Sequence, residues 1–271
     1  MSSAARRSLV IPVAAVVATT ALAFAAARLE RGLGDPAPLT GWALAGLFVF
    51  LSAFNARKRL AALPVGKAST WLALHAAGGA AALAVYWLHT RSVWPEGSFE
   101  RALAGAFYAV SISGIGGYVL QRYYPPLLSA TGVEVILERV PEETARLRER
   151  AEALVLDCTA RTRSDVLARH YAENLDWFMR RPRNVFDHCL AGRAGRQWVR
   201  HQTAAVRRYL AEDERRYLDK LARLLYHKND VDFHYAAQTV MKGWLLLHVP
   251  LAAAAAVLAV WHIILVHAYA L

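Results

Sequence analysis

Cysteine is almost absent from this chain: Cys158 and Cys189 are the only two among its 271 residues. No Cys-x-x-Cys-His sequence occurs, which argues against covalent attachment of a c-type haem, and no group of cysteines is present for an iron–sulfur cluster. We interpret the two cysteines as ordinary thiols in a reducing compartment.

The sequence also lacks the glycine-rich turns that bind nucleotides. It contains no Gly-x-Gly-x-x-Gly, no phosphate-binding loop and no strand-rich segment suited to a flavin or nicotinamide domain. The chain therefore does not have the sequence of a self-contained NAD(P)H-driven reductase.

Charged residues make up 20% of the chain, yet they are nearly missing from five apolar stretches. Each stretch is long enough, or nearly so, to cross a bilayer with some tilt: 9–27, 41–53, 71–90, 102–120 and 241–268. A charged stretch of more than a hundred residues separates the last two and cannot be a span. We predict an all-α membrane protein, a five-span helical bundle with a helical cytoplasmic insert between spans four and five. Spans one to four fall in 1–121, the insert in 122–240, and span five, packed with the other four, in 241–271.

The distribution of Lys and Arg predicts the orientation of these spans. Arg6 and Arg7 precede the first stretch, and the loop 54–70 carries four more basic residues, whereas the other short loops are nearly balanced. By the positive-inside rule the N-terminus, the loop 54–70 and the insert lie in the cytoplasm, which predicts a multi-pass protein of the bacterial cytoplasmic (inner) membrane surrounded by lipid. The net charge of +11 follows from this bias and from an Arg-rich insert. Nucleic-acid binding is the disfavoured interpretation.

The insert is predicted to be helical from Glu134 to about Ala236. Pro141 followed by two glutamates is typical of a helix start, and a long amphipathic segment is predicted from Gln197 to Tyr226. Its arginine clusters suit either an acidic redox partner or anionic lipid headgroups, and the sequence does not decide between them.

Four histidines form two pairs with one spacing. His75 and His89 lie fourteen residues apart in the third stretch, and His248 and His262 lie fourteen apart in the fifth. Fourteen helical steps return to within about 40° of the same face and rise about 21 Å, which fits a hydrocarbon layer of about 30 Å. Because spans three and five are parallel, His75 is level with His248 on the cytoplasmic side, and His89 with His262 on the outer side. Neutral imidazole binds iron well, so the pattern predicts two haems stacked across the membrane.

Other residues near these histidines are candidates for contacts with the haem. Four glycines would let the edge of a macrocycle approach the backbone, although they equally suit close helix packing: Gly78, Gly79, Gly114 and Gly117. Arg57 on the inside and Arg91 on the outside are candidates for pairing with haem propionates. The alternative, equally open, is that these arginines only set the topology or are ordinary loop charges.

The four-histidine pattern resembles the dihaem transmembrane cytochromes b, which include cytochrome b of quinol:cytochrome c oxidoreductases and the membrane domain of ferric reductases and NADPH oxidases. In them two helices each bring two histidines, as His75-x13-His89 and His248-x13-His262 do here. The resemblance covers about 68–121 and 241–268. The insert is unlike either family, and no Pro-Glu-Trp-Tyr quinol-site sequence is present. The resemblance implies two non-covalent haems b.

The predicted function is transmembrane electron transfer between a quinol or cytoplasmic donor and a partner on the other side. Two axial histidines leave no open iron position, so we predict an electron-transfer subunit of an oxidoreductase complex, with no catalytic residue and with quinone and redox proteins as candidate partners. The alternative is a haem-free membrane interaction or transport protein that uses the insert as a binding module. His234, fourteen residues before His248, is expected to be a solvated or interfacial histidine, with a third haem less favoured.

Overall fold

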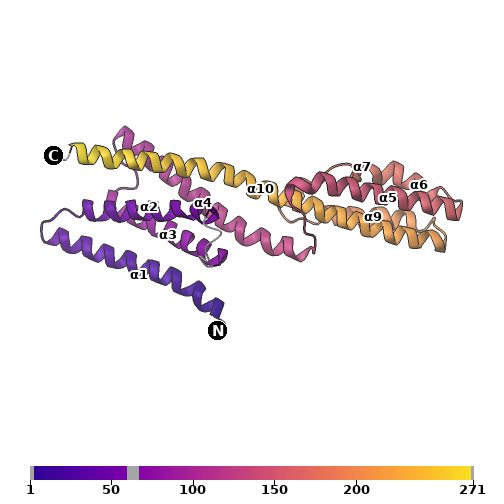
Figure 1. Cartoon of the computed structure of the whole chain (residues 1–271), viewed down its shortest axis with the longest axis horizontal. Helices are drawn as coiled ribbons and strands as arrows, with labels where there is room; N and C mark the ends of the chain where they lie inside the picture. The colour runs from indigo at the N-terminus through magenta and orange to yellow at the C-terminus, as the bar shows by residue number, and fades with distance from the viewer. Residues whose placement is uncertain (1–2, 60–66, 270–271) are drawn as a thin grey trace. The chain divides into compact units, whose positions relative to one another are not determined.

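Every regular element is a helix in the part of the chain that the computed structural model describes, residues 3–59 and 67–269. Five of these helices are long and apolar enough to cross a membrane: α1 (Ser3–Arg31), α2 (Ala37–Arg59), α3 (Ala68–Thr90), α4 (Ser98–Ala130) and α10 (Glu212–Tyr269) (Figure 1). The predicted all-α membrane class with five spans is confirmed.

Two of the spanning helices are much longer than their apolar stretches. The helix α4 continues past residue 120 to Ala130, and α10 runs for 58 residues, so the end of the insert and span five form one helix. No glycine or proline interrupts the sequence between Glu212 and Lys242, which lets the helix continue through the change in composition.

The chain divides into two compact units, which we name the membrane unit (1–119 with 245–271) and the insert unit (120–244). In the membrane unit α3 packs closely against α1 and α2. A small apolar core of Ala82, Tyr86, Ala104 and Phe107 joins α3 to α4, and the rings of Tyr86 and Phe107 stack with centroids 4.5 Å apart. Most other apolar side chains of this unit are exposed or half-buried, as expected for helices surrounded by lipid.

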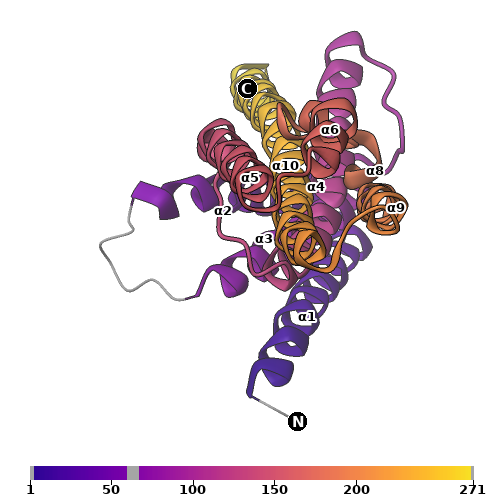
Figure 2. The ribbon, with the colours of Figure 1, turned by 90° about the vertical axis from the view of Figure 1, so that its right-hand side faces the viewer.

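The insert unit surrounds the first part of α10. Its other helices are α5 (Val140–Thr162), α6 (Val166–His170), the π-helical turn η2 (Tyr171–Leu175), α7 (Asp176–Met179), α8 (Val185–Cys189) and α9 (Ala194–Arg207), after the short turn η1 (Leu137–Arg139). Figure 2 shows α5, α6 and α9 around α10, and their apolar faces share one core. The predicted helix start at Pro141 is confirmed, because Pro141 lies in the first turn of α5.

The predicted single segment from Gln197 to Tyr226 is wrong, because the chain turns between α9 and α10. Val206 before this turn and Leu210 within it are both buried, and the Glu214 carboxylate accepts the Ala211 backbone N–H at 2.9 Å. A capping contact of this kind starts a new helix. The apolar periodicity runs through the turn because both helices face the same core.

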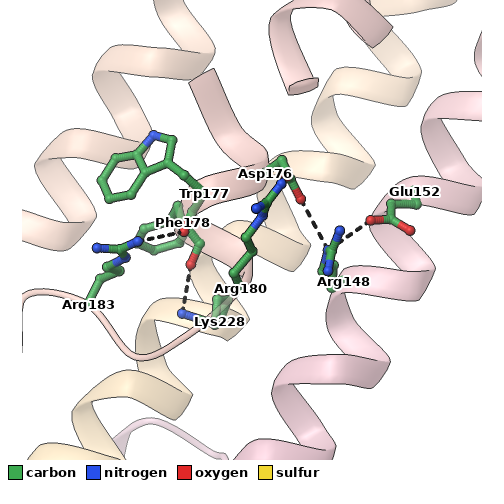
Figure 3. Close-up of polar contacts among 8 residues, drawn as sticks. All are labelled: Arg148, Glu152, Asp176, Trp177, Phe178, Arg180, Arg183 and Lys228. Carbon is green, nitrogen blue, oxygen red and sulfur yellow. Dashed lines mark hydrogen bonds and ion pairs between the residues drawn. The ribbon is translucent and has the colours of Figure 1, made fainter. Parts of the chain in front are cut away.

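A buried ion pair lies in the core of the insert unit. The Lys228 ammonium contacts both carboxylate oxygens of Asp232 at 2.8 Å and the backbone carbonyls of Phe178 at 2.9 Å and Arg181 at 3.0 Å. Figure 3 shows Lys228 directed at the Phe178 carbonyl, beside an ion-pair network of Arg148 with Glu152 and Asp176. Burial lowers the pKa of Lys228 and raises the pKa of Asp232 to about 6.

Candidate functional site

The structure brings together the two histidine pairs that the sequence predicts, both within the membrane unit. The ring centroids of His75 (α3) and His248 (α10) lie 6.5 Å apart with ring planes at 77°. Those of His89 (α3) and His262 (α10) lie 6.4 Å apart with planes at 86°. The same two helices therefore present two facing imidazole pairs of nearly equal geometry.

The distance between the rings can be compared with two kinds of contact. A direct N–H···N hydrogen bond of about 2.9 Å would place the centroids about 5.2 Å apart when the rings are aligned. A metal ion bound by both rings at about 2.0–2.1 Å would place them about 6.3 Å apart. The observed 6.4 and 6.5 Å agree with the second geometry. The ring spacing in each pair is therefore the one that a single metal ion bound by both imidazoles would require.

A hydroxyl group contacts one histidine of each pair. The Thr40 hydroxyl lies 3.0 Å from His89 Nδ1, and the Ser113 hydroxyl lies 2.8 Å from His248 Nδ1. Both hydroxyls also donate to backbone carbonyls, Thr40 to Pro36 at 3.0 Å and Ser113 to Val110 at 3.0 Å.

A hydroxyl has a single proton to donate. When that proton goes to the carbonyl, the hydroxyl oxygen accepts the N–H of Nδ1 from the histidine. In this arrangement His89 and His248 carry the proton on Nδ1 and the lone pair on Nε2, the atom through which each ring would bind a metal ion. Hydrogen bonds of this kind orient metal-binding histidines.

The other two histidines are held by aromatic rings. Phe54 lies 4.8 Å from His75, and Phe99 stacks on His262 with centroids 6.4 Å apart and planes at 14°. The Nδ1 atom of His75 is buried and has no partner within hydrogen-bond distance in the described part of the chain, although the backbone of Leu51 lies nearby. Each pair thus combines one hydroxyl-oriented ring with one ring packed against an aromatic side chain.

Only one of the four predicted glycines is shown beside a histidine. A Cβ atom on Gly114 would lie 3.6 Å from His248 Cε1, so this glycine lets α4 approach the ring. Gly78 instead faces α2, where a Cβ would meet Phe50 at 3.0 Å. A Cβ on Gly79 would meet nothing within 4 Å. Gly117 is buried in α4.

Sequence reasoning missed two residues of α2 that touch His89. A Cβ atom on Gly41 would lie 3.0 Å from His89 Cε1, and Thr40 precedes this glycine. The available signal was a hydroxyl residue followed by a small residue near the start of span two. Nothing in the sequence spacing connects Thr40 to a histidine 49 positions later.

The two arginines predicted to pair with haem propionates are Arg91 and Arg57. Arg91 ends α3 and forms an ion pair with Glu30 at 2.7 Å, so its charge is already balanced by a protein carboxylate. The side chain of Arg57 lies outside the described residues.

His234 belongs to the insert unit and is 5% exposed, so the expectation of a solvated histidine is wrong. The Thr131 hydroxyl donates to the Leu128 carbonyl at 2.7 Å and so accepts the Nε2–H of His234 at 2.9 Å. The amide of Gln238 donates to Nδ1 at 3.5 Å. Both ring nitrogens are occupied, which leaves none for the iron of a third haem.

No cluster of three or more His, Cys, Asp or Glu suited to a metal ion occurs among residues 3–59 and 67–269. Within that range the facing histidine pairs are the strongest candidate for a metal or cofactor site. Comparisons with protein-family models, curated proteins and solved structures found no match for this chain.

Proposed function

We propose that this protein binds two b-type haems without covalent bonds and carries electrons across a bacterial cytoplasmic membrane. His75 and His248 would hold the haem on the cytoplasmic side, and His89 and His262 the haem on the outer side. The observation that carries the proposal is the two facing imidazole pairs on the same two helices, with centroids 6.5 and 6.4 Å apart. Bound haem supplies one-electron redox chemistry.

The residues of the chain would provide ligation and orientation. Two imidazoles would hold each haem iron, which favours electron transfer over chemistry at the metal. Thr40 and Ser113 contact Nδ1 of His89 and of His248 and would orient the Nε2 atom of each ring toward the iron. The fourteen-residue spacing separates the two levels by about 21 Å, most of the hydrocarbon thickness. A quinol or a cytoplasmic protein would supply electrons, and a partner on the other side would receive them.

The test is a measurement of haem on the purified full chain. A pyridine haemochrome assay with a reduced-minus-oxidised spectrum is expected to give two haems b per chain, and His89→Ala is expected to give one. His267→Ala is the matched control, because His267 lies on the same helix as His262, is exposed, and bonds the Ile263 carbonyl at 2.8 Å. A folded but colourless wild-type protein would contradict the proposal and favour a haem-free interaction or transport protein.

A further inference from the structure

The short helix α8 exposes apolar side chains in a polar part of the chain. Phe186 is 82% exposed and Leu190, directly after the helix, is 68% exposed. The two residues are one helical turn apart and so share a face. Large neighbouring apolar side chains left in water mark a contact surface.

Two tyrosines tie α8 to the part of α4 that directly follows an apolar stretch. The Tyr124 hydroxyl donates to the Cys189 carbonyl at 2.6 Å, and the Tyr123 hydroxyl donates to the Leu190 carbonyl at 3.4 Å. These tyrosines come three and four residues after the stretch 102–120 ends. At about 1.5 Å per residue this is within about 6 Å of its end along the helix.

The residue after Leu190 packs into a cluster at the same level. Ala191 lies against an apolar cluster around Tyr124, Phe233 and Ala237, and Leu120 and Met241 belong to that cluster. The apolar stretch of α4 ends at residue 120, and the apolar stretch of α10 begins at residue 241. The C-terminal end of α8 therefore lies beside the positions where the apolar stretches of α4 and α10 meet the polar insert.

The surrounding charge fits a negatively charged membrane surface. Residues 180–200 contain six arginines and one acidic residue, Asp187. The Asp187 carboxylate accepts the Ala194 backbone N–H at 3.0 Å and is turned into the loop after α8. Arg181 and Arg193, on the two sides of α8, are both exposed. Apolar side chains flanked by arginine are typical of segments that lie in the interface of an anionic bilayer.

We propose that α8 and Leu190 form an interfacial anchor for the insert unit. Phe186 and Leu190 enter the boundary between headgroups and acyl chains, while Arg181 and Arg193 contact lipid phosphates. The anchor requires that α4 and α10 cross a membrane, and it does not depend on haem binding.

Spin labels on the full chain in nanodiscs of phosphatidylcholine and phosphatidylglycerol test the anchor. In a Cys158→Ala/Cys189→Ala background, labels are placed at Phe186→Cys, at Leu190→Cys and, as the control, at Leu156→Cys. Leu156 lies on α5 and is 68% exposed. Its neighbour Asp157 accepts a hydrogen bond from Tyr217 of α10. Tyr217 comes about 36 Å of helix before residue 241, so Leu156 serves as the control position far from the apolar stretch. Collisions with a water-soluble nickel chelate are expected to be several-fold rarer at 186 and 190 than at 156, and collisions with oxygen more frequent.

Two outcomes would overturn the anchor. One is nickel access at 186 and 190 equal to that at 156. The other is shielding of both labels from nickel and from oxygen, because that would mean that a protein surface covers them. Circular dichroism of each labelled protein checks that the helices are retained.

The phosphate contacts have their own measurement. Arg181→Gln/Arg193→Gln is expected to raise nickel access at position 186 in the anionic nanodiscs, and replacing phosphatidylglycerol by phosphatidylcholine is expected to do the same. Arg161→Gln, on the exposed end of α5, is a single-charge control and should leave this value unchanged. If neither change affects nickel access at 186, the arginines do not contact lipid phosphates.

Discussion

At the scale of single residues, the Ser113 hydroxyl orients His248 from 2.8 Å. Ser113→Ala removes this hydrogen-bond partner of Nδ1, so the hydroxyl no longer orients the ring. We expect the affinity for the cytoplasmic-side haem to fall about 10–100-fold, the usual effect of losing such a partner, while the outer haem is retained. Titration of haem into the haem-free protein, followed by its absorption spectrum, measures both sites.

The neighbouring Ser111→Ala provides the control, because the Ser111 hydroxyl bonds the Phe107 carbonyl of its own helix. Thr40→Val should produce the reciprocal result and weaken the outer site. Equal losses in Ser113→Ala and Ser111→Ala would mean that the hydroxyl at 113 does not orient a ligand.

The sequence predicts the histidine pairs but not their hydroxyl partners, for a geometric reason. The spacing within α3 and within α10 follows from helix geometry alone, so matching levels can be read directly. The rotation of α2 and α4 about their own axes depends on packing between helices. Thr40 and Ser113 therefore become visible as partners of His89 and His248 only in the folded chain.

At the scale of elements, the buried pair of Lys228 and Asp232 connects α10 to the end of α7 and the turn that follows. Asp232→Ala leaves the ammonium group with two backbone carbonyls and no opposite charge. Loss of one partner of a buried ion pair lowers the free energy of unfolding by about 3–5 kcal/mol, whereas replacing both partners by apolar residues lowers it less. We expect a lower apparent Tm by circular dichroism for Asp232→Ala than for Lys228→Met/Asp232→Leu.

Arg161→Ala removes one side of an exposed ion pair with Asp157 and is the control. Exposed pairs of this kind contribute little to stability, so no change in Tm is expected. If Asp232→Ala melts like Arg161→Ala, the buried pair does not hold the insert unit together.

Two buried histidines make the stability of the insert unit depend on pH. Burial is the largest cause that lowers the pKa of His188 and of His234. Protonation of these rings therefore favours the unfolded chain. Their contribution to the free energy of unfolding is complete above about pH 6.5. Below that pH the free energy of unfolding falls by up to about 1.4 kcal/mol per pH unit for each ring that stays neutral in the folded chain. Asp232 acts in the opposite direction as the pH falls through about 6, because its pKa is raised.

The informative window is therefore between pH 7.5 and 6. The apparent Tm of the full chain should fall across it, and His188→Gln should reduce the fall because one titrating ring is gone. An identical fall in wild type and His188→Gln would contradict the assignment.

Apolar composition predicts which segments span the membrane but not where helices end. The stretches 102–120 and 241–268 mark the lipid-facing parts of α4 and α10, yet both helices extend into the polar insert. Helix continuation needs only the absence of breakers, while membrane insertion needs the absence of charge. The turn at 208–211 escaped prediction because the side chains on both sides face one core.

At the scale of the whole molecule, the proposed path has two haems in series, so losing either one should stop conduction. His75→Ala and His89→Ala each remove one haem at a different level. Neither variant should pass electrons from an external reductant to ferricyanide trapped inside proteoliposomes, because the remaining haem is about 21 Å from the missing level. The measurement is the loss of ferricyanide absorbance, with His267→Ala and protein-free vesicles as the conducting and non-conducting controls. Wild-type rates in either single-haem variant would show that electrons cross by another route, since a series path fails at its first missing step.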